Sequence, residues 1–216
     1  MRTALLQPPP ASPAGAVRLR LSPDVRIPQI LDAALVEFAE RGFAATRMDD
    51  IARRSGLSKG GLYAHFGSKD AVFEALLQRS LTPPDLGEMS LPQPAGPAQF
   101  AQWLVDRLYA ALAQPMAVAT LRLLIAESER VPRLVEAWQR QVAQPYLVLL
   151  GQVLRRHAGP GASDLLVREP WLAVAPVVHA VVAQLVFGGG LPELQRHRQA
   201  HAEMLAELLG AGRDAA

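Results

Sequence analysis

Apolar residues recur every three or four positions along most of the chain, and this spacing predicts amphipathic helices. Gly42 is expected to end the first helix as a left-handed C′ glycine, and Phe43 can then fold back onto the helix. Pro28 suits only a first helical turn, which leaves the start of this helix open. Strand-like alternation is absent, so the pattern predicts an all-α protein. The apolar stripe of the first helix contains Ile27, Ile30, Leu31, Ala34, Leu35, Phe38 and Ala39.

Three shorter helices follow, each introduced by a capping residue. Thr46 is predicted to cap the first, with Asp49 three positions on, while Ser58 and Ser68 cap the other two. Gly56 supplies the positive φ of the turn between the first pair. Two short helices joined by such a turn and packed on a longer one form a helix-turn-helix. Its interior is predicted to contain Ile51, Ala52, Leu57, Leu62 and Phe66.

Proline and glycine divide the chain into four parts. Residues 1–24 hold five prolines and are expected to form a flexible, basic arm, either a solvated tail or an arm for nucleic acid. Residues 25–80 carry the helix-turn-helix and a connecting fourth helix. Residues 81–97, with five prolines and two glycines, form a connector to the larger domain of residues 98–216. Helices are predicted there over 98–114, 116–129, 131–157, 166–188 and 192–210, with kinks at Pro145 and Pro176.

Composition narrows the class of protein. Half of the 216 residues are apolar, which is enough for a sizeable core. A membrane span is not expected, because the chain has no run of about 18 uncharged apolar residues, and the nearest candidate, residues 171–190, is better interpreted as a buried helix. The chain contains no cysteine, which excludes disulfides, thiolate catalysis and cysteine zinc sites. Because the N-terminal residues lack a secretory pattern, we expect a cytoplasmic protein.

Positive charge collects at the N-terminal side. Residues 1–80 hold eleven Arg and Lys against eight Asp and Glu, a net charge of +3, whereas residues 81–216 hold eleven against twelve, a net charge of −1. The exposed face of the third helix would present Lys59, Gly60, Gly61, Tyr63 and His65. A lysine at a helix start, a phenol on a stiff ring and two glycines that admit a close backbone suit a polyanion.

Residues 27–77 carry motifs in a characteristic order. They include Phe38-Ala39-Glu40-Arg41-Gly42-Phe43, Asp50-Ile51-Ala52, Ser55-Gly56-Leu57-Ser58-Lys59-Gly60-Gly61-Leu62-Tyr63-Ala64-His65-Phe66 and Ser68-Lys69-Asp70. This third of the chain strongly resembles the DNA-binding domain of the TetR family of bacterial transcriptional regulators. The resemblance implies a homodimer that binds a double-stranded DNA operator. Its larger C-terminal domain would bind a small-molecule effector and dimerise through the last two long helices.

The resemblance also assigns residues to DNA. Tyr63, His65 and Lys69 match phosphate contacts, and Lys59 and Gly61 match positions that face base edges. Gly60 beside them leaves the recognition face nearly bare, so base contacts from this helix would be few. The start of the second helix would touch backbone or bases through Thr46 and Arg47.

Effector contacts are harder to assign, because aromatic and polar residues in helices more often belong to the core or an interface. The apolar composition favours an apolar or aromatic effector. His179 is either a satisfied core residue or a polar handle in the pocket. Arg53 and Arg54 are expected to be a solvated helix face. The pocket candidates are Trp103, Tyr109, Arg122, Glu127, Trp138, Tyr146 and His179.

No catalytic motif or phosphate-binding glycine loop occurs, so an enzyme, a cofactor and a metal are not expected. Glu193, His197 and His201 share one face of the last helix, but surface helices carry such residues routinely. The predicted function is a dimeric repressor released from DNA by a small molecule. The alternative, motivated by Gly60 and Gly61, is an effector-binding or scaffold protein of the same fold without a specific operator.

Overall fold

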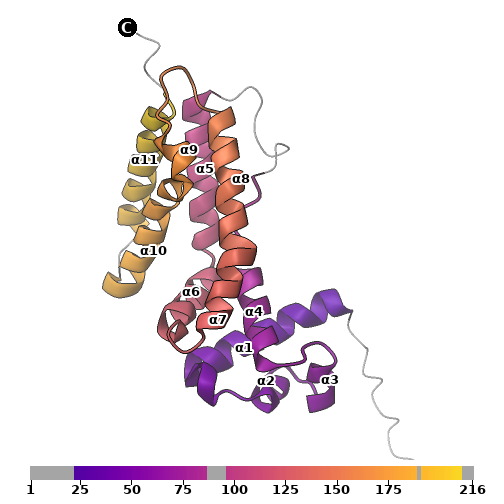
Figure 1. The fold of residues 1–216 in the computed structure, drawn as a ribbon. Helices are drawn as coiled ribbons and strands as arrows, with labels where there is room; N and C mark the ends of the chain where they lie inside the picture. The colour runs from indigo at the N-terminus through magenta and orange to yellow at the C-terminus, as the bar shows by residue number, and fades with distance from the viewer. Residues whose placement is uncertain (1–21, 87–95, 189–190, 211–216) are drawn as a thin grey trace, which may run out of the picture.

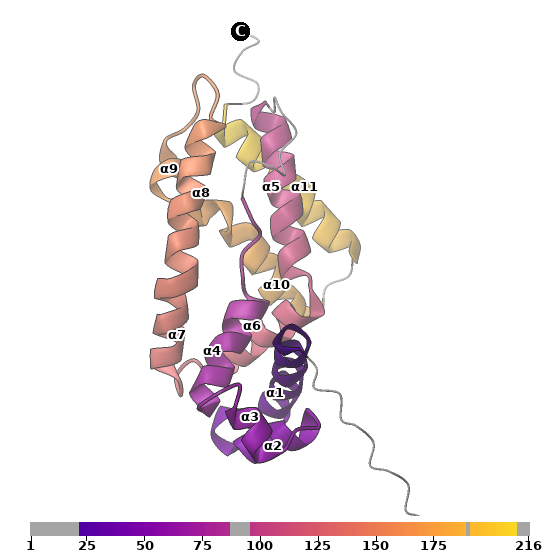
Figure 2. The same cartoon turned by 90° about the vertical axis from the view of Figure 1, so that its right-hand side faces the viewer.

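The computed structural model describes residues 22–86, 96–188 and 191–210, and this part of the chain consists of helices and connections, without strands. The all-α prediction is confirmed. Four helices form an N-terminal head: α1 (Pro23–Ala45), α2 (Met48–Arg54), α3 (Lys59–Tyr63) and α4 (Lys69–Ser80). The remaining α-helices are α5 (Pro97–Leu112), α6 (Pro115–Glu127), α7 (Pro132–Trp138), α8 (Gln144–Arg156), α9 (Leu165–Arg168), α10 (Ala175–Phe187) and α11 (Leu191–Leu208). The molecule is elongated, with α2 and α3 at the end remote from α9 (Figures 1 and 2).

The predicted arm of residues 1–24 lies almost wholly outside the described residues. Its last two residues belong to α1, which begins at Pro23. Pro28 therefore lies inside α1 rather than in its first turn, contrary to expectation. Helix α4 ends at Ser80 and α5 begins at Pro97, and residues 87–95 of the predicted connector lie outside the described residues.

The corner between α1 and α2 begins at Gly42, whose φ of 77° and ψ of 165° interrupt the helical backbone. Phe43 then turns back, as expected, and stacks on Phe38 with 5.6 Å between ring centroids. It also meets the edge of Phe73 from α4 at 5.2 Å. Three aromatic rings from two helices thus close one end of the head's core.

Two apolar cores divide the molecule, and their border differs from the division along the chain. The lower core joins the head to α6 and α7, through buried residues such as Leu123, Leu124 and Leu134. The upper core is made by α5 and α8–α11, here called the upper bundle. Helices α6 and α7 follow the connector in sequence, yet they pack on α1 and α4 (Figure 1). They link the head to the upper bundle.

Two predicted helices are not uniform α-helices. The segment 166–188 is divided into α9, a 3-10 turn over Pro170–Ala173, and α10, because Pro170 begins the 3-10 turn and Pro176 lies in the first turn of α10. Near Pro145 the helix continues, but a π-helical turn over Gln139–Ala143 comes directly before it. This wider turn leaves room for a proline ring that an α-helical interior would exclude.

Within the described part of the chain, no single helix is long and apolar enough to cross a membrane. Helices α5 and α6 pass that test only as a pair, bent by 70° at the break between them.

We predict that Gly42→Ala destabilises the protein. At this φ and ψ a non-glycine residue costs about 1–3 kcal/mol, and an added Cβ would lie 2.9 Å from Oε1 of Glu127. Gly60→Ala is the matched control, because nothing lies within 4 Å of a Cβ there. Alanine at this helical position should raise the free energy of unfolding by up to about 1 kcal/mol. Urea unfolding measures both, and equal stability of the two variants would contradict the role of Gly42.

Candidate nucleic-acid interface

The helix-turn-helix is held by its turn and by two apolar anchors. Gly56 has a φ of 70°, as predicted for the turn, and the amide of Leu57 donates to the carbonyl of Ala52 at 2.8 Å. Ile51 of α2 and Leu62 of α3 are fully buried in the lower core. Packing of these two side chains in the lower core therefore fixes the angle between α2 and α3.

The outer face of α3 is bare and accessible. Ser58 caps the helix as predicted, its Oγ accepting from the amide of Gly61 at 3.1 Å. Gly60 is exposed with open space around it, while Tyr63 is 45% exposed and His65 is exposed. A phosphate or a base edge can approach this backbone without meeting a side chain at Gly60.

Lys59 is exposed but not free of protein contacts. Its Nζ lies 3.1 Å from Oδ1 of Asp49 in α2, and both side chains are more than half exposed. An exposed ion pair of this kind contributes about 0–1 kcal/mol. A strong anion can therefore displace Asp49 from the ammonium at small cost.

Arg47 and Thr46 take roles different from those expected at the start of α2. Arg47, not Thr46, is the N-cap residue, and its amide donates to Oδ2 of Asp50, so Asp49 is not the capping carboxylate. Thr46 is 1% exposed, and its hydroxyl donates to the carbonyl of Gly42 at 2.8 Å. The Thr46 side chain consequently cannot reach DNA in this structure, whereas the exposed side chain of Arg47 can.

Lys69 lies over the α1–α2 corner. Its Nζ donates to the carbonyls of Phe43 at 2.6 Å, Ala44 at 3.1 Å and Thr46 at 2.9 Å, and sits 4.4 Å from the Phe43 ring centroid. Desolvation lowers the pKa of this amine, although Asp70 and Glu127 oppose the shift. All three ammonium donors are engaged, so contact with a phosphate would require the side chain to release a carbonyl. The backbone amides at the start of α4, near the Ser68 cap, can instead meet an anion directly.

An ion-pair cluster that the sequence pattern does not predict lies behind α2. Glu37 of α1 is 3% exposed, and its carboxylate lies 2.6 Å from Nε of Arg54 and 3.2 Å from Nε of Arg41. Arg54 also bonds to Glu40 at 2.7 Å, so it is not merely part of a solvated face. The hydrogen bond to Glu37 raises the pKa of the Arg54 guanidinium. This cluster joins α1 to α2. The sequence carries no signal for it, because the burial of Glu37 becomes visible only in the folded protein.

The predicted effector residues do not form one pocket. Arg122 and His179 are exposed, and Glu127 is buried at the junction with the head. His179 faces outward because its side of α10 does not pack on the core. It approaches His197, with 6.5 Å between ring centroids. In the part of the chain that the structure describes, no group of three or more His, Cys, Asp or Glu could hold a metal ion.

The other candidates are divided between the two cores. Trp138 packs on the lower core, whereas Trp103 and Tyr146 pack on the upper one. Tyr109 is 5% exposed within the upper core and lies beside His201.

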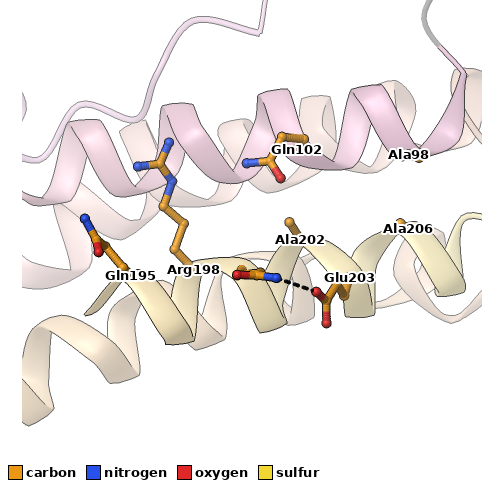
Figure 3. Close-up of a pocket in the computed structure, with 8 residues that line it drawn as sticks. Ala98, Gln102, Gln195, Arg198, Ala202, Glu203 and Ala206 are labelled. Carbon is orange, nitrogen blue, oxygen red and sulfur yellow. Dashed lines mark hydrogen bonds between the residues drawn. The ribbon is translucent and has the colours of Figure 1, made fainter. Parts of the chain in front are cut away.

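A groove of about 500 Å³ runs between α5 and α11 (Figure 3). Alanines and amide side chains line it, together with Arg198, which bonds to Asp106 of α5 at 2.6 Å. None of the residues predicted for the effector pocket lines this groove.

We predict that Lys69→Ala lowers the free energy of unfolding more than Lys59→Ala. Hydrogen bonds made by a charged group contribute about 1.5–3 kcal/mol each, and the change leaves carbonyls of the corner without their donor. Lys59→Ala removes only an exposed ion pair, so its effect should stay below about 1 kcal/mol. Thermal unfolding of both variants measures the difference. If their stabilities match, the amine does not hold the corner.

This geometry defines a helix-turn-helix protein with a second helical domain. Residues 30–76 match the model of the bacterial regulatory proteins of the tetR family, and residues 102–207 match the AefR-like transcriptional repressor C-terminal domain. The chain belongs to the TetR family of bacterial transcriptional regulators.

Relatives share mainly the head. The chain is 49% identical over 69 residues to the transcriptional activator FasR of Mycolicibacterium smegmatis, and 37% identical over 73 residues to the transcriptional repressor KstR2 of Rhodococcus jostii. These segments cover 31% and 34% of this chain and 32% and 33% of the relatives, so the match spans about a third of their length. The structure of Salmonella enterica GusR is similar over 88% of this chain and 98% of that one, with a TM-score of 0.63 and 23% identity, which shows a shared fold.

Proposed function

We propose that the protein is a dimeric repressor that binds operator DNA and is released from it by a small molecule. One observation carries the DNA-binding role: the exposed face of α3 presents an open backbone at Gly60 between Lys59 and Tyr63. Repression rather than activation is favoured by the match to the AefR-like repressor domain.

Binding would combine backbone contacts with few base contacts. The starts of α2 and α4 offer amide groups for phosphates, and Tyr63 and Arg47 add side-chain donors. Lys59 would face base edges after exchanging Asp49 for DNA. Because a glycine face carries little base information, sequence-dependent deformability of the duplex would supply part of the specificity.

Dimerisation is supported by an unpaired apolar stripe on α10. Val178 is 39% and Val186 is 66% exposed, and Val182 and Leu185 lie half-buried between them. Phe187 at the end of the helix is 84% exposed. Helices α10 and α11 lie together at one side of the upper bundle, as a two-fold interface would require (Figure 1). A second copy of the chain would remove this stripe from water.

Release would be a population shift transmitted through α6. The Glu127 side chain at the end of α6 is 8% exposed and lies beside Gly42, and its carboxylate acts electrostatically on Lys69. A displacement of α6 would therefore reach the corner that positions α2 and α4. Two heads must stand about 34–36 Å apart to enter successive major grooves, so a small displacement in each head weakens both half-site contacts together.

The DNA-binding role is tested with the fragment upstream of the protein's own gene. At one salt concentration, that fragment should bind about a thousandfold more tightly than random DNA of equal length. Lys59→Ala should weaken operator binding by about 1–3 kcal/mol and random binding by less, because it removes a base contact. Arg155→Ala removes the same charge from an exposed position of α8 and should leave the affinity for both DNAs unchanged. Equal affinity of the wild type for both DNAs would favour the scaffold alternative.

The dimer is tested with a buried charge. Val186→Glu would place two carboxylates in the proposed interface and should weaken the dimer at least about tenfold, because unpaired buried charges are costly. Val148→Glu on α8, where the valine is 64% exposed, is the matched control and should leave the dimer intact. Sedimentation equilibrium measures both. Dissociation by the α8 change alone would place the interface elsewhere.

A further inference from the structure

The upper core contains a buried polar pair that the proposed DNA contacts do not use. Tyr109 of α5 and His201 of α11 are 5% and 3% exposed, and their ring centroids are 5.9 Å apart. The Tyr109 hydroxyl has no hydrogen-bond partner among the described residues, and the only one for the His201 ring there is the backbone of Ala173. Native proteins leave few buried polar groups unpaired, because each has given up its hydrogen bonds to water.

Both groups are uncharged near neutral pH. Desolvation by burial lowers the pKa of His201 to about 4, partly offset by the backbone carbonyl of Ala173. Burial also raises the pKa of the Tyr109 hydroxyl, with Arg198 opposing the shift. The pair therefore offers hydrogen-bond donors and acceptors without a net charge.

The surroundings of the pair are apolar. Residues such as Leu104, Val177 and Leu205 belong to the same core and are fully buried. Arg198 is the cation that lowers the pKa of Tyr109 electrostatically. Its guanidinium already donates two hydrogen bonds to Asp106, at 2.6 and 2.9 Å. An anionic group bound at Tyr109 would lose its hydration, and it could gain Arg198 as a partner only in competition with Asp106.

We propose that Tyr109 and His201 are the polar anchors of the effector site and select an uncharged, mainly apolar molecule carrying a hydroxyl or carbonyl oxygen. This oxygen would bond to the Tyr109 hydroxyl and to a nitrogen of His201, while the apolar remainder replaces core contacts between α5 and α11. The α5–α11 groove in Figure 3 is the proposed route of entry, because Arg198 both lines the groove and acts on Tyr109. The assignment rests on the proposed function, since it names the class of molecule that would release the repressor.

Tyr109→Phe tests the unpaired state of the hydroxyl. Removing a buried hydroxyl that has no partner should raise the melting temperature of the ligand-free protein, since phenylalanine fills the same space. Tyr63→Phe changes an exposed phenol of the head and serves as the control, with no expected shift. If the melting temperature of Tyr109→Phe is equal to or lower than that of the wild type, the hydroxyl is already satisfied by protein or water, and the assignment is overturned.

Ligand class is tested with 1-decanol and decanoate, which share a chain length and differ in charge. Calorimetric titration of the full chain should show decanol binding at least about tenfold more tightly than decanoate. Tyr109→Phe should weaken decanol binding roughly threefold to tenfold, the effect of one hydrogen bond, while Tyr63→Phe leaves it unchanged. Equal binding of the two probes, no binding of decanol, or equal binding to both variants would overturn the assignment. Operator binding by the ligand-free protein in the same preparation shows separately whether the proposed function stands.

Discussion

The head depends on how the corner between α1 and α2 satisfies its carbonyl groups. The break at Gly42 leaves the last carbonyls of α1 without helical partners, and burial would make each of them costly. Thr46 from the chain itself and Lys69 from α4 supply the missing donors. The position of α2, and of α3 beyond it, follows from this arrangement. Buried Glu37, paired with Arg41 and Arg54, holds the other side of α2.

The same corner is where the two parts of the molecule meet. Glu127 at the end of α6 packs against Gly42, so a helix of the C-terminal region contacts the backbone that sets the geometry of the head. Helices α6 and α7 share a core with α1 and α4, whereas α5 and α8–α11 enclose a second core. A change in the upper bundle can therefore act on the head through packed helices, without a separate mobile element.

The two cores differ in their polar groups. In the head, buried charges are paired across helices, and these pairs give α1 and α2 a fixed orientation. In the upper core, Tyr109 and His201 are neutral, and the Tyr109 hydroxyl lacks a hydrogen-bond partner among the described residues, which is a costly state for a core that serves only stability.

The sequence alone determined the helical class, the turn at Gly56, the cap at Ser58 and the likeness to a DNA-binding head, because these follow from local spacing and short-range hydrogen bonds. Local rules also misplaced some features: Thr46 was expected to cap α2, and 166–188 to form one helix. Tertiary structure decided what depends on distant partners, namely the burial of Glu37 with Arg54, the three carbonyls held by Lys69 and the contact of Glu127 with Gly42. It also separated the predicted effector residues, since a side chain's surroundings depend on how whole helices pack, which periodicity along one helix does not specify.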